Sequence, residues 1–307
     1  MIPDLTLLSF VIISYNRPLD TIAAIKNVLQ LEDVSGYQKE IVVINNGSTD
    51  SYQSLTDYLD TLPTSERAMV NYQHHPENLG VARGRNLGIS LAKADLLIFM
   101  DDDAEFSHHN IIGIALQLLN QYETSNNVKI LAFREFRTVT KEYYIATKNK
   151  QRSQEREFLT NYYIGSGHLI KREVFDKVGT YTTEFFYGME EYDLAYKALD
   201  AGFRILYTAD ITVLHKKSPD GREAEATLTR WNLENKTVVA YKYLPLFYVL
   251  THLFFWSGYF LWTSGFKFPA LFTAYRNIFS KIRRTPRHLI SNNTLQYIRS
   301  VKGRLWY

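Results

Sequence analysis

The 307-residue chain contains no cysteine, which excludes disulfide bonds, thiolate nucleophiles and metal sites with cysteine ligands. It also lacks long Pro/Ser or Gly/Ser tracts, and with 46% hydrophobic and 22% charged residues its composition is typical of a globular protein. The length suits one large domain or two modest ones. Residues 1–4 include no basic segment followed by an apolar stretch, so we expect no secretory signal and a main body that stays on the cytoplasmic side.

Acidic residues are missing from the last part of the chain, which makes the charge distribution asymmetric. Residues 1–234 contain 24 Lys/Arg and all 32 Asp/Glu, whereas residues 235–307 contain 11 Lys/Arg and no acid. A basic segment attached to an acidic body indicates a negatively charged partner. Nucleic acid and an anionic membrane surface are the two usual kinds.

Short apolar runs alternate with helical periodicity in residues 1–100. The runs are rich in β-branched residues and show no polar alternation, which is typical of parallel strands covered on both faces. Asp20 is the expected N-cap of the first helix. The pattern predicts strands at 10–13, 41–44, 70–72 and 96–100, and helices at 20–31, 55–62 and 80–94. Strands and helices in this order predict a doubly wound α/β layer.

Polar clusters follow three of the predicted strands. Residues 14–17 come after the first strand, residues 45–48 after the second, and Asp101–Asp103 after the fourth. Because ligands of such sheets bind at the carboxyl ends of the strands, we expect the three clusters to meet at one edge.

The middle of the chain, residues 105–235, has a more mixed pattern. A polar stretch at 138–157 is expected to be a mobile loop. We predict helices at 111–122, 172–178 and 191–201, and strands at 129–133, 203–207 and 211–214.

Three consecutive aspartates follow the fourth predicted strand. Like charges this close raise one another's pKa, so the cluster is unfavourable unless a cation compensates it. Carboxylates are preferred ligands of Mg²⁺ and Mn²⁺. Along an extended chain Asp101 and Asp103 project to one side and Asp102 to the other. A solvated acidic turn, or a helix cap made by Asp103, is the alternative without a metal.

Six motifs occur in the order that is typical of one enzyme family. They are Val11–Arg17, Asn45–Asp50, Asn78–Gly80 with Arg85–Gly88, Asp101–Asp103, Met189–Leu194 and His215. With these motifs the chain resembles inverting glycosyltransferases of family two, and a rhamnosyltransferase-like subgroup is one option. The resemblance covers residues 10–217. It implies a GT-A fold, which is a Rossmann-like, mostly parallel sheet flanked by helices, here with a helical, basic and aromatic C-terminal extension.

The resemblance implies a set of residues that bind a nucleotide-sugar donor. Ser14, Tyr15 and Arg17 lie in the loop that meets the base and the phosphates. Asn46 stands where the family often has an aspartate that reads the base. An amide donates as well as accepts, so UDP-, dTDP- and GDP-sugars all stay open as donors. Arg85 belongs to the helix that frames the donor.

The same resemblance implies a metal site and a catalytic base. Asp101 and Asp102 belong to the donor-binding set, while Asp101, Asp103 and His215 are expected to hold the Mn²⁺ or Mg²⁺ that bridges the diphosphate. An ordinary histidine without a metal is the alternative for His215. The base is expected at Glu191, where the family usually carries an aspartate.

Two neighbouring acids, Glu190 and Asp193, are alternatives to Glu191 as the base. An acidic first helical turn is also favoured by the helix dipole without any catalytic role. Residues 165–168 are expected to line the acceptor side, because glycines allow close approach of a substrate to the backbone.

These roles predict a metal-dependent inverting glycosyltransferase that moves a sugar from a nucleotide-diphosphate donor to a glycan or a lipid-linked saccharide. We expect a nucleotide-sugar-binding half at 1–104, an acceptor-binding and catalytic half at 105–235, and a membrane-associating helical extension at 236–307. A nucleotidyltransferase is one alternative, but residues 14–17 are not the glycine-rich basic loop that a triphosphate needs. A non-catalytic carbohydrate-binding protein is the other, although a decayed site would be expected to lose its carboxylates.

The C-terminal extension has features of a membrane-binding segment. Residues 244–266 carry no Asp, Glu, Lys or Arg and could span a bilayer. Proline, histidine, glycines and many aromatic rings within this stretch, and the basic residues after it, favour helices that lie on the anionic inner leaflet. We therefore expect a peripheral or monotopic protein on the cytoplasmic face of the inner membrane. A soluble helical subdomain and a true span are the alternatives. Nucleic acid is not expected as a partner, because the body is acidic and no nucleic-acid-binding motif occurs.

Overall fold

The first four strands of the sheet are parallel, as the apolar runs predict. In the computed structural model, which describes residues 6–220 and 224–305, these strands stand in the order β3-β2-β1-β4. Their bounds are β1 (Thr6–Ser14), β2 (Tyr37–Asn46), β3 (Val70–His75) and β4 (Leu96–Asp101). Residues 1–4, for which we expect no secretory signal, lie outside the described part.

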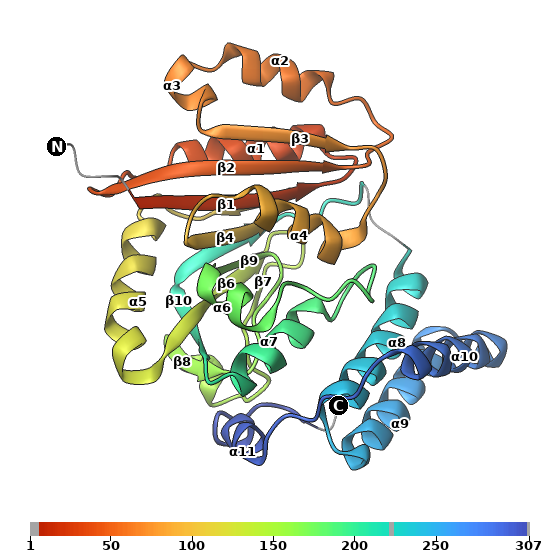
Figure 1. Ribbon diagram of the computed structural model, residues 1–307. Coiled ribbons are helices and arrows are strands. Elements are labelled where there is room, and N and C mark those ends of the chain that lie inside the picture. The colour runs from red at the N-terminus through yellow and green to blue at the C-terminus, as the bar shows by residue number, and fades with distance from the viewer. Residues whose placement is uncertain (1–5, 221–223, 306–307) are drawn as a thin grey trace.

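The sheet continues with mixed strands, so only its N-terminal half is purely parallel. β9 (Gly167–Lys171) lies between β4 and β6 (Val128–Arg137) and runs antiparallel to both. Next to β6 stands β10 (Arg204–His215), which is parallel to β6 and antiparallel to β5 (Ala104–Phe106). Together with β7 (Glu142–Tyr144) and β8 (Glu157–Thr160), the described residues form one ten-stranded sheet (Figure 1).

Helices cover both faces of the sheet, and the alternation of side chains along β1 explains the two cores. Phe10 and Ile12 point to one face, where they join the core under α1 (Pro18–Leu29), α2 (Gln53–Thr61) and α5 (Ile111–Asn126). Val11 points to the other face, towards α4 (Gly80–Leu91), α6 (Arg172–Val178) and α7 (Glu190–Asp200). The short helix α3 (Thr64–Arg67) precedes β3.

Three expectations about local structure need correction. Helix α1 begins at Pro18, with Arg17 rather than Asp20 at the N-cap, because proline suits the first helical turn. Residues 204–215 form one strand instead of two, with an irregular register between Thr208 and Thr212. The polar stretch expected to be a mobile loop contains β7, which pairs with β6, and the 3₁₀ helix η1 (Arg152–Gln154).

The C-terminal extension is helical, as expected, and its first helix is anchored to α7. It consists of α8 (Glu225–Tyr243), α9 (Leu246–Thr263), α10 (Phe268–Arg284) and α11 (Asn292–Ser300). Asp193 of α7 is fully buried and accepts hydrogen bonds from Lys242 Nζ at 2.5 Å and from Tyr243 Oη at 2.9 Å. This buried pair fixes α8 against α7, because a buried carboxylate without its cation is strongly unfavourable.

Helices α8, α9 and α10 also share a small hydrophobic core of their own, which includes Leu233, Phe260 and Ile278. Figure 1 shows these helices at the opposite end of the molecule from α2 and α3, with α8 the one that lies next to α7. Within residues 6–220 and 224–305, no helix combines the length and the apolar character needed to cross a bilayer. This finding goes against the alternative of a true span over residues 244–266, most of which α9 covers.

Candidate functional site

The register of the parallel strands brings the predicted polar clusters to one edge of the sheet. Ser14 at the end of β1 is paired with Asn45 in β2, and Ile13 is paired with Asp101 in β4. His215 reaches the same edge because the end of β10 is paired with Ala104, directly after the three aspartates. The convergence expected from the carboxyl ends of the strands is thus confirmed.

A cavity of about 150 Å³ opens at this edge, and we call it the carboxylate cavity. Eight of the ten predicted site residues line it, namely Tyr15, Arg17, Asn46, Arg85, Asp101, Asp102, Asp103 and His215. The two exceptions are Ser14, which is buried behind the cavity, and Glu191, which reaches it through Arg85.

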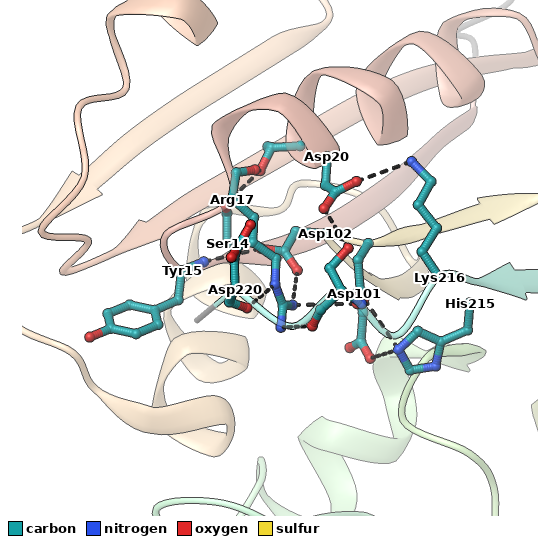
Figure 2. Close-up of polar contacts among 12 residues, drawn as sticks. Ser14, Tyr15, Arg17, Asp20, Asp101, Asp102, His215, Lys216 and Asp220 are labelled. Carbon is teal, nitrogen blue, oxygen red and sulfur yellow. Dashed lines mark hydrogen bonds and ion pairs between the residues drawn. The ribbon is translucent and has the colours of Figure 1, made fainter. Parts of the chain in front are cut away.

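Asp102 points away from its two neighbours and binds the loop after β1. Its Oδ1 lies 2.8 Å from Arg17 Nη1, and its Oδ2 accepts a hydrogen bond from the Tyr15 backbone N–H at 3.1 Å. Burial raises the pKa of Asp102 to about 7, although the Arg17 guanidinium acts in the opposite direction. Figure 2 shows the Tyr15 ring directed away from the carboxylates, so the backbone of Tyr15 contacts Asp102.

Asp101, Asp103 and His215 form a second group at the turn that follows β4. One ligand atom from each lies within 4.8 Å of those from the other two. His215 Nε2 is 3.2 Å from Asp103 Oδ1 and 3.8 Å from Asp101 Oδ2. Two carboxylates and an imidazole at these separations are a donor set that fits a hard divalent cation.

Glu135 supports this group from behind and was not predicted from the sequence. Its Oε2 is 3.2 Å from His215 Nδ1 and also accepts a hydrogen bond from Ser166 Oγ. A carboxylate on the far nitrogen orients the imidazole, so that Nε2 faces Asp101 and Asp103. The sequence contains one signal for Glu135: it is an acid just beyond Phe133, where we expected the apolar strand to end, and the strand continues through it.

Charge compensation explains the protonation of this group. Burial would raise the pKa of Asp103, but the hydrogen bond and charge of His215 outweigh burial and lower it to about 2. Burial would lower the pKa of His215, but its hydrogen bonds with Asp103 and Glu135 raise it to about 9. A cation bound by the three ligands would compete with the imidazole proton for the same carboxylate oxygens.

Arg85 joins the aspartates to the acidic start of α7. Its Nη1 lies 2.8 Å from Glu191 Oε1 and 3.3 Å from Glu190 Oε1, and its Nη2 lies 3.6 Å from Asp101 Oδ1. Arg85 is buried and also donates to the Gly165 carbonyl at 3.0 Å. The guanidinium therefore fixes the carboxylate of Glu191 relative to Asp101.

The three acids at the start of α7 have different environments. Glu190 is buried, and burial together with the neighbouring Glu191 raises its pKa. Asp193 is fully buried and is used by Lys242 and Tyr243. Glu191 is the one of these three with an appreciable exposed fraction, 15% of its side chain, so it has the best access to a substrate.

Asn46 and Ser14 are largely engaged inside the protein. The Asn46 amide donates to Asn78 Oδ1 and to the Gly80 carbonyl, both at 3.2 Å, and its oxygen accepts from the Leu79 N–H at 3.0 Å. Because both N–H groups are used, Asn46 can only accept a further hydrogen bond, as an aspartate would. Ser14 Oγ contacts Thr21 and Tyr52 and does not reach the carboxylate cavity.

Residues 165–168 are only partly available to an acceptor. His168 is fully buried in β9, where Nε2 lies 2.8 Å from Tyr181 Oη, and Ser166 is buried beside Glu135. Gly165 remains next to Glu191. Phe186, Tyr187 and Lys217 line the carboxylate cavity without having been predicted, because they come from loops that have no motif of their own.

A family model described as glycosyl transferase family 2 matches residues 9–179, more than half of the chain. The chain belongs to glycosyl transferase family 2. It is therefore an enzyme of the glycosyltransferase class, as the sequence motifs predict. An uncharacterized protein of Haemophilus influenzae is 30% identical over 181 residues, which are 56% of this chain and 91% of that protein. The dTDP-rhamnosyl transferase RfbF of Shigella flexneri is 27% identical over 218 residues, 67% of each chain.

Solved structures confirm the GT-A fold of this family 2 glycosyltransferase. GalNAc-T7 with UDP, GalNAc and Mn²⁺ superimposes with a TM-score of 0.62 at 16% identity over 82% of this chain, which spans 51% of that protein. A second structure is that of the mannosyltransferase PcManGT from Pyrobaculum calidifontis in complex with GDP-Man and Mn²⁺. It superimposes with a TM-score of 0.60 at 15% identity, and the match covers 95% of this chain and 78% of PcManGT.

Gly165→Ala in this family 2 enzyme should lower turnover by about 100-fold, since a misplaced reactive group is sufficient for such a loss. A Cβ at this position would stand 2.2 Å from Glu191 Oε1 and 2.9 Å from Arg85 Nη2, so both side chains must move. Release of nucleoside diphosphate from the donor measures the effect. Gly113→Ala in α5 is the matched control, because a Cβ there meets nothing within 4 Å. Full activity of Gly165→Ala would contradict the assigned position of Glu191.

Proposed function

We propose that this glycosyltransferase transfers a sugar from a nucleotide-diphosphate donor with inversion at the anomeric carbon, and that it depends on Mn²⁺ or Mg²⁺. The observation that carries the proposal is the meeting of Asp101, Asp103 and His215, whose ligand atoms lie within 4.8 Å of one another beside the partly buried Arg17 and the buried Arg85 of the same cavity. We assign the donor to the half of the domain made by residues 1–104, and the acceptor to the half made by residues 105–235.

Asp101, Asp103 and His215 would hold the metal ion, which when bound neutralises charge on the departing diphosphate. Arg17 lines the same cavity, and its guanidinium contacts Asp102 and Asp103 at 2.8 and 3.6 Å. Tyr15 and the loop after β1 place the nucleotide, while Ser14 supports this loop through Tyr52, whose hydroxyl lies 3.2 Å from the Arg17 backbone nitrogen.

Glu191 is proposed as the general base. It accepts the proton of the acceptor hydroxyl while that oxygen forms a bond to the anomeric carbon of the donor sugar. The bond between the anomeric carbon and the diphosphate breaks, and the diphosphate leaves with the electron pair. Attack on the face opposite the leaving group inverts the anomeric configuration. Arg85 orients the carboxylate through its contact of 2.8 Å.

The nucleotide is proposed to be a uridine, thymidine or guanosine diphosphate. The one free lone pair of the Asn46 amide suits a ring N–H, which uracil, thymine and guanine all carry. The similarity to a dTDP-rhamnosyl transferase makes dTDP-rhamnose the first donor to be tested.

The acceptor is proposed to be a glycan or a lipid-linked saccharide at the inner leaflet of the membrane, with α9 and α10 lying on its anionic surface. These helices expose a band of large apolar side chains, namely Leu246, Phe247, Leu250, Phe254, Trp262, Phe268, Phe272 and Phe279. Lys281, Arg283 and Arg284 stand in the last turn of α10. Arg283 and Arg284 are exposed, whereas Lys281 is paired with Glu234 of α8 at 3.0 Å. Exposed apolar and basic side chains on the same helices support interfacial binding.

Asp103→Asn and Glu191→Gln separate metal binding from proton transfer. We expect the wild type to release nucleoside diphosphate from one of the UDP-, dTDP- or GDP-sugars only when Mn²⁺ or Mg²⁺ is present. Asp103→Asn should lose metal-dependent binding of that donor. Glu191→Gln should keep this binding and lose about 10²- to 10⁴-fold in turnover, which is the usual contribution of a general base. Calorimetry measures binding, and nucleoside diphosphate release measures turnover.

Asp57→Asn, a change at an exposed position of α2, is the matched control and should retain both properties. Turnover that persists in chelator would contradict the metal dependence. Full turnover of Glu191→Gln would place the base elsewhere.

The triple variant Phe254→Ser, Trp262→Ser and Phe272→Ser should sediment several-fold more weakly with phosphatidylglycerol-containing vesicles. The substitutions remove three large apolar side chains that are 71–74% exposed. The wild type should bind vesicles of phosphatidylcholine alone more weakly, since the basic residues then lose their partner. Val139→Ser, at an equally exposed position outside the extension, is the control. Equal sedimentation of wild type and triple variant would contradict interfacial binding.

A further inference from the structure

A second cavity, of about 240 Å³, lies where the C-terminal extension meets the catalytic half of the chain, and we call it the α8–α9 cavity. Its wall takes Lys236 from α8, Trp256 from α9 and Tyr192 from α7, and the chain segments around Lys148 and Lys302 complete it. The proposed function does not use this cavity.

The wall of the α8–α9 cavity is basic and contains no acid. Lys148, Lys236, Lys302 and Arg304 line it, whereas no Asp or Glu does. In the part of the chain that the structure describes, none of the three lysines forms an ion pair. Burial and the nearby charges of Lys148 and Arg304 lower the pKa of Lys236 to about 8. A bound anion would stabilise the three lysines, because like charges close together repel one another.

Aromatic rings accompany these cations. The ammonium of Lys236 lies 4.1 Å from the centre of the Trp256 ring and 5.9 Å from that of Tyr192. Tyr192 stacks on Tyr162, with ring centres 4.9 Å apart and an interplanar angle of 13°. Rings of this kind offer flat apolar faces, next to which the cations can bind an anionic group.

The first turn of α7 lies between the two cavities. On one side Glu191 binds Arg85, which lines the carboxylate cavity. On the other side Met189 and Tyr192 line the α8–α9 cavity. A molecule in the α8–α9 cavity would therefore lie against the same helical turn that carries Glu191, the proposed base.

We propose that the α8–α9 cavity binds the acceptor, and that this acceptor is a saccharide that carries a phosphate or diphosphate group. Lys236, with Lys148 and Lys302 at the exposed margin, binds the anionic group, and the rings of Tyr192 and Trp256 contact the sugar. The inference rests on the proposed function, because it assigns the second substrate of that reaction. Both soluble sugar phosphates and lipid-linked sugar diphosphates carry such an anionic group attached to a sugar.

The place of the α8–α9 cavity beside α9 favours an acceptor whose phosphate group lies near a membrane surface. His252 and Trp256 of α9 line the α8–α9 cavity, while Leu250, Phe254 and Trp262 of the same helix are 64–74% exposed. One face of α9 thus borders the cavity and another carries the apolar band. The head group of a lipid-linked saccharide could enter at this boundary while its chain stays in the membrane.

Titration with glucose 1-phosphate, geranyl diphosphate and glucose, followed by tryptophan fluorescence, tests the proposal. Both anions should change the emission, glucose should not, and Trp256→Phe should remove the response. Lys236→Met should weaken the binding of both anions at least tenfold, while Lys177→Met, at an exposed position of α6, should bind them like the wild type. Stronger binding of geranyl diphosphate identifies a lipid-linked acceptor, and stronger binding of glucose 1-phosphate a soluble one.

Lys302→Ala, at an exposed position, should also weaken binding and keeps the test valid should Lys236→Met fold poorly. Asp103→Asn should lose donor binding but retain the emission change of Trp256 when the anions bind. Failure of the donor site and failure of the α8–α9 cavity can therefore be distinguished. An emission change that is the same with glucose as with the anions, or that persists at full affinity in both lysine variants, would overturn the proposal. So would the absence of any change.

Discussion

The compensation of negative charge at the carboxyl edge of the sheet is the constraint on which the site depends. Asp101, Asp102 and Asp103 follow a buried strand, and Glu190 and Glu191 approach them from α7. Five carboxylates in one region would repel one another if nothing balanced them. Arg17 compensates Asp102, and Arg85 compensates the two glutamates.

The pairing of these carboxylates with the two arginines bears on where a metal ion could bind. The two arginines lie closest to Asp102 and Glu191, both at 2.8 Å, whereas their contacts with Asp103 and Asp101 are longer, at 3.6 Å. Asp103 is also paired with His215 Nε2 at 3.2 Å. We propose that a divalent cation takes the place of the imidazole charge beside Asp101 and Asp103. Asp193, in the same helix as Glu191, anchors α8 and so places the α8–α9 cavity next to the helical turn that carries the proposed base.

Much of the site could be predicted from the sequence because its signals are local. Three of the four parallel strands end where an apolar run meets a polar cluster, and the parallel register then brings those ends together. The predicted pairing of Asp101 with Asp103 is also found, although the chain turns at Asp102 and Asp103 instead of staying extended.

Other features depend on contacts between distant segments and could not be predicted. β9 begins at a glycine, and only the tertiary fold inserts it between β4 and β6. Glu135 gains its role because β10 places His215 beside it, 80 residues later in the chain. The buried position of Ser14 results from Thr21 and Tyr52 packing behind it, and Asn46 is occupied by residues 78–80. The α8–α9 cavity is assembled from segments that no single motif connects.

The most direct test of the central claim is an anomalous difference map from a crystal that contains Mn²⁺ and the nucleoside diphosphate of the active donor. The account predicts one strong manganese peak bounded by Asp101, Asp103 and His215, with Arg17 still on Asp102 and Arg85 still on Glu191. A bound nucleoside diphosphate with no manganese at these three residues, or with manganese ligated by Glu190 or Glu191 instead, would contradict it.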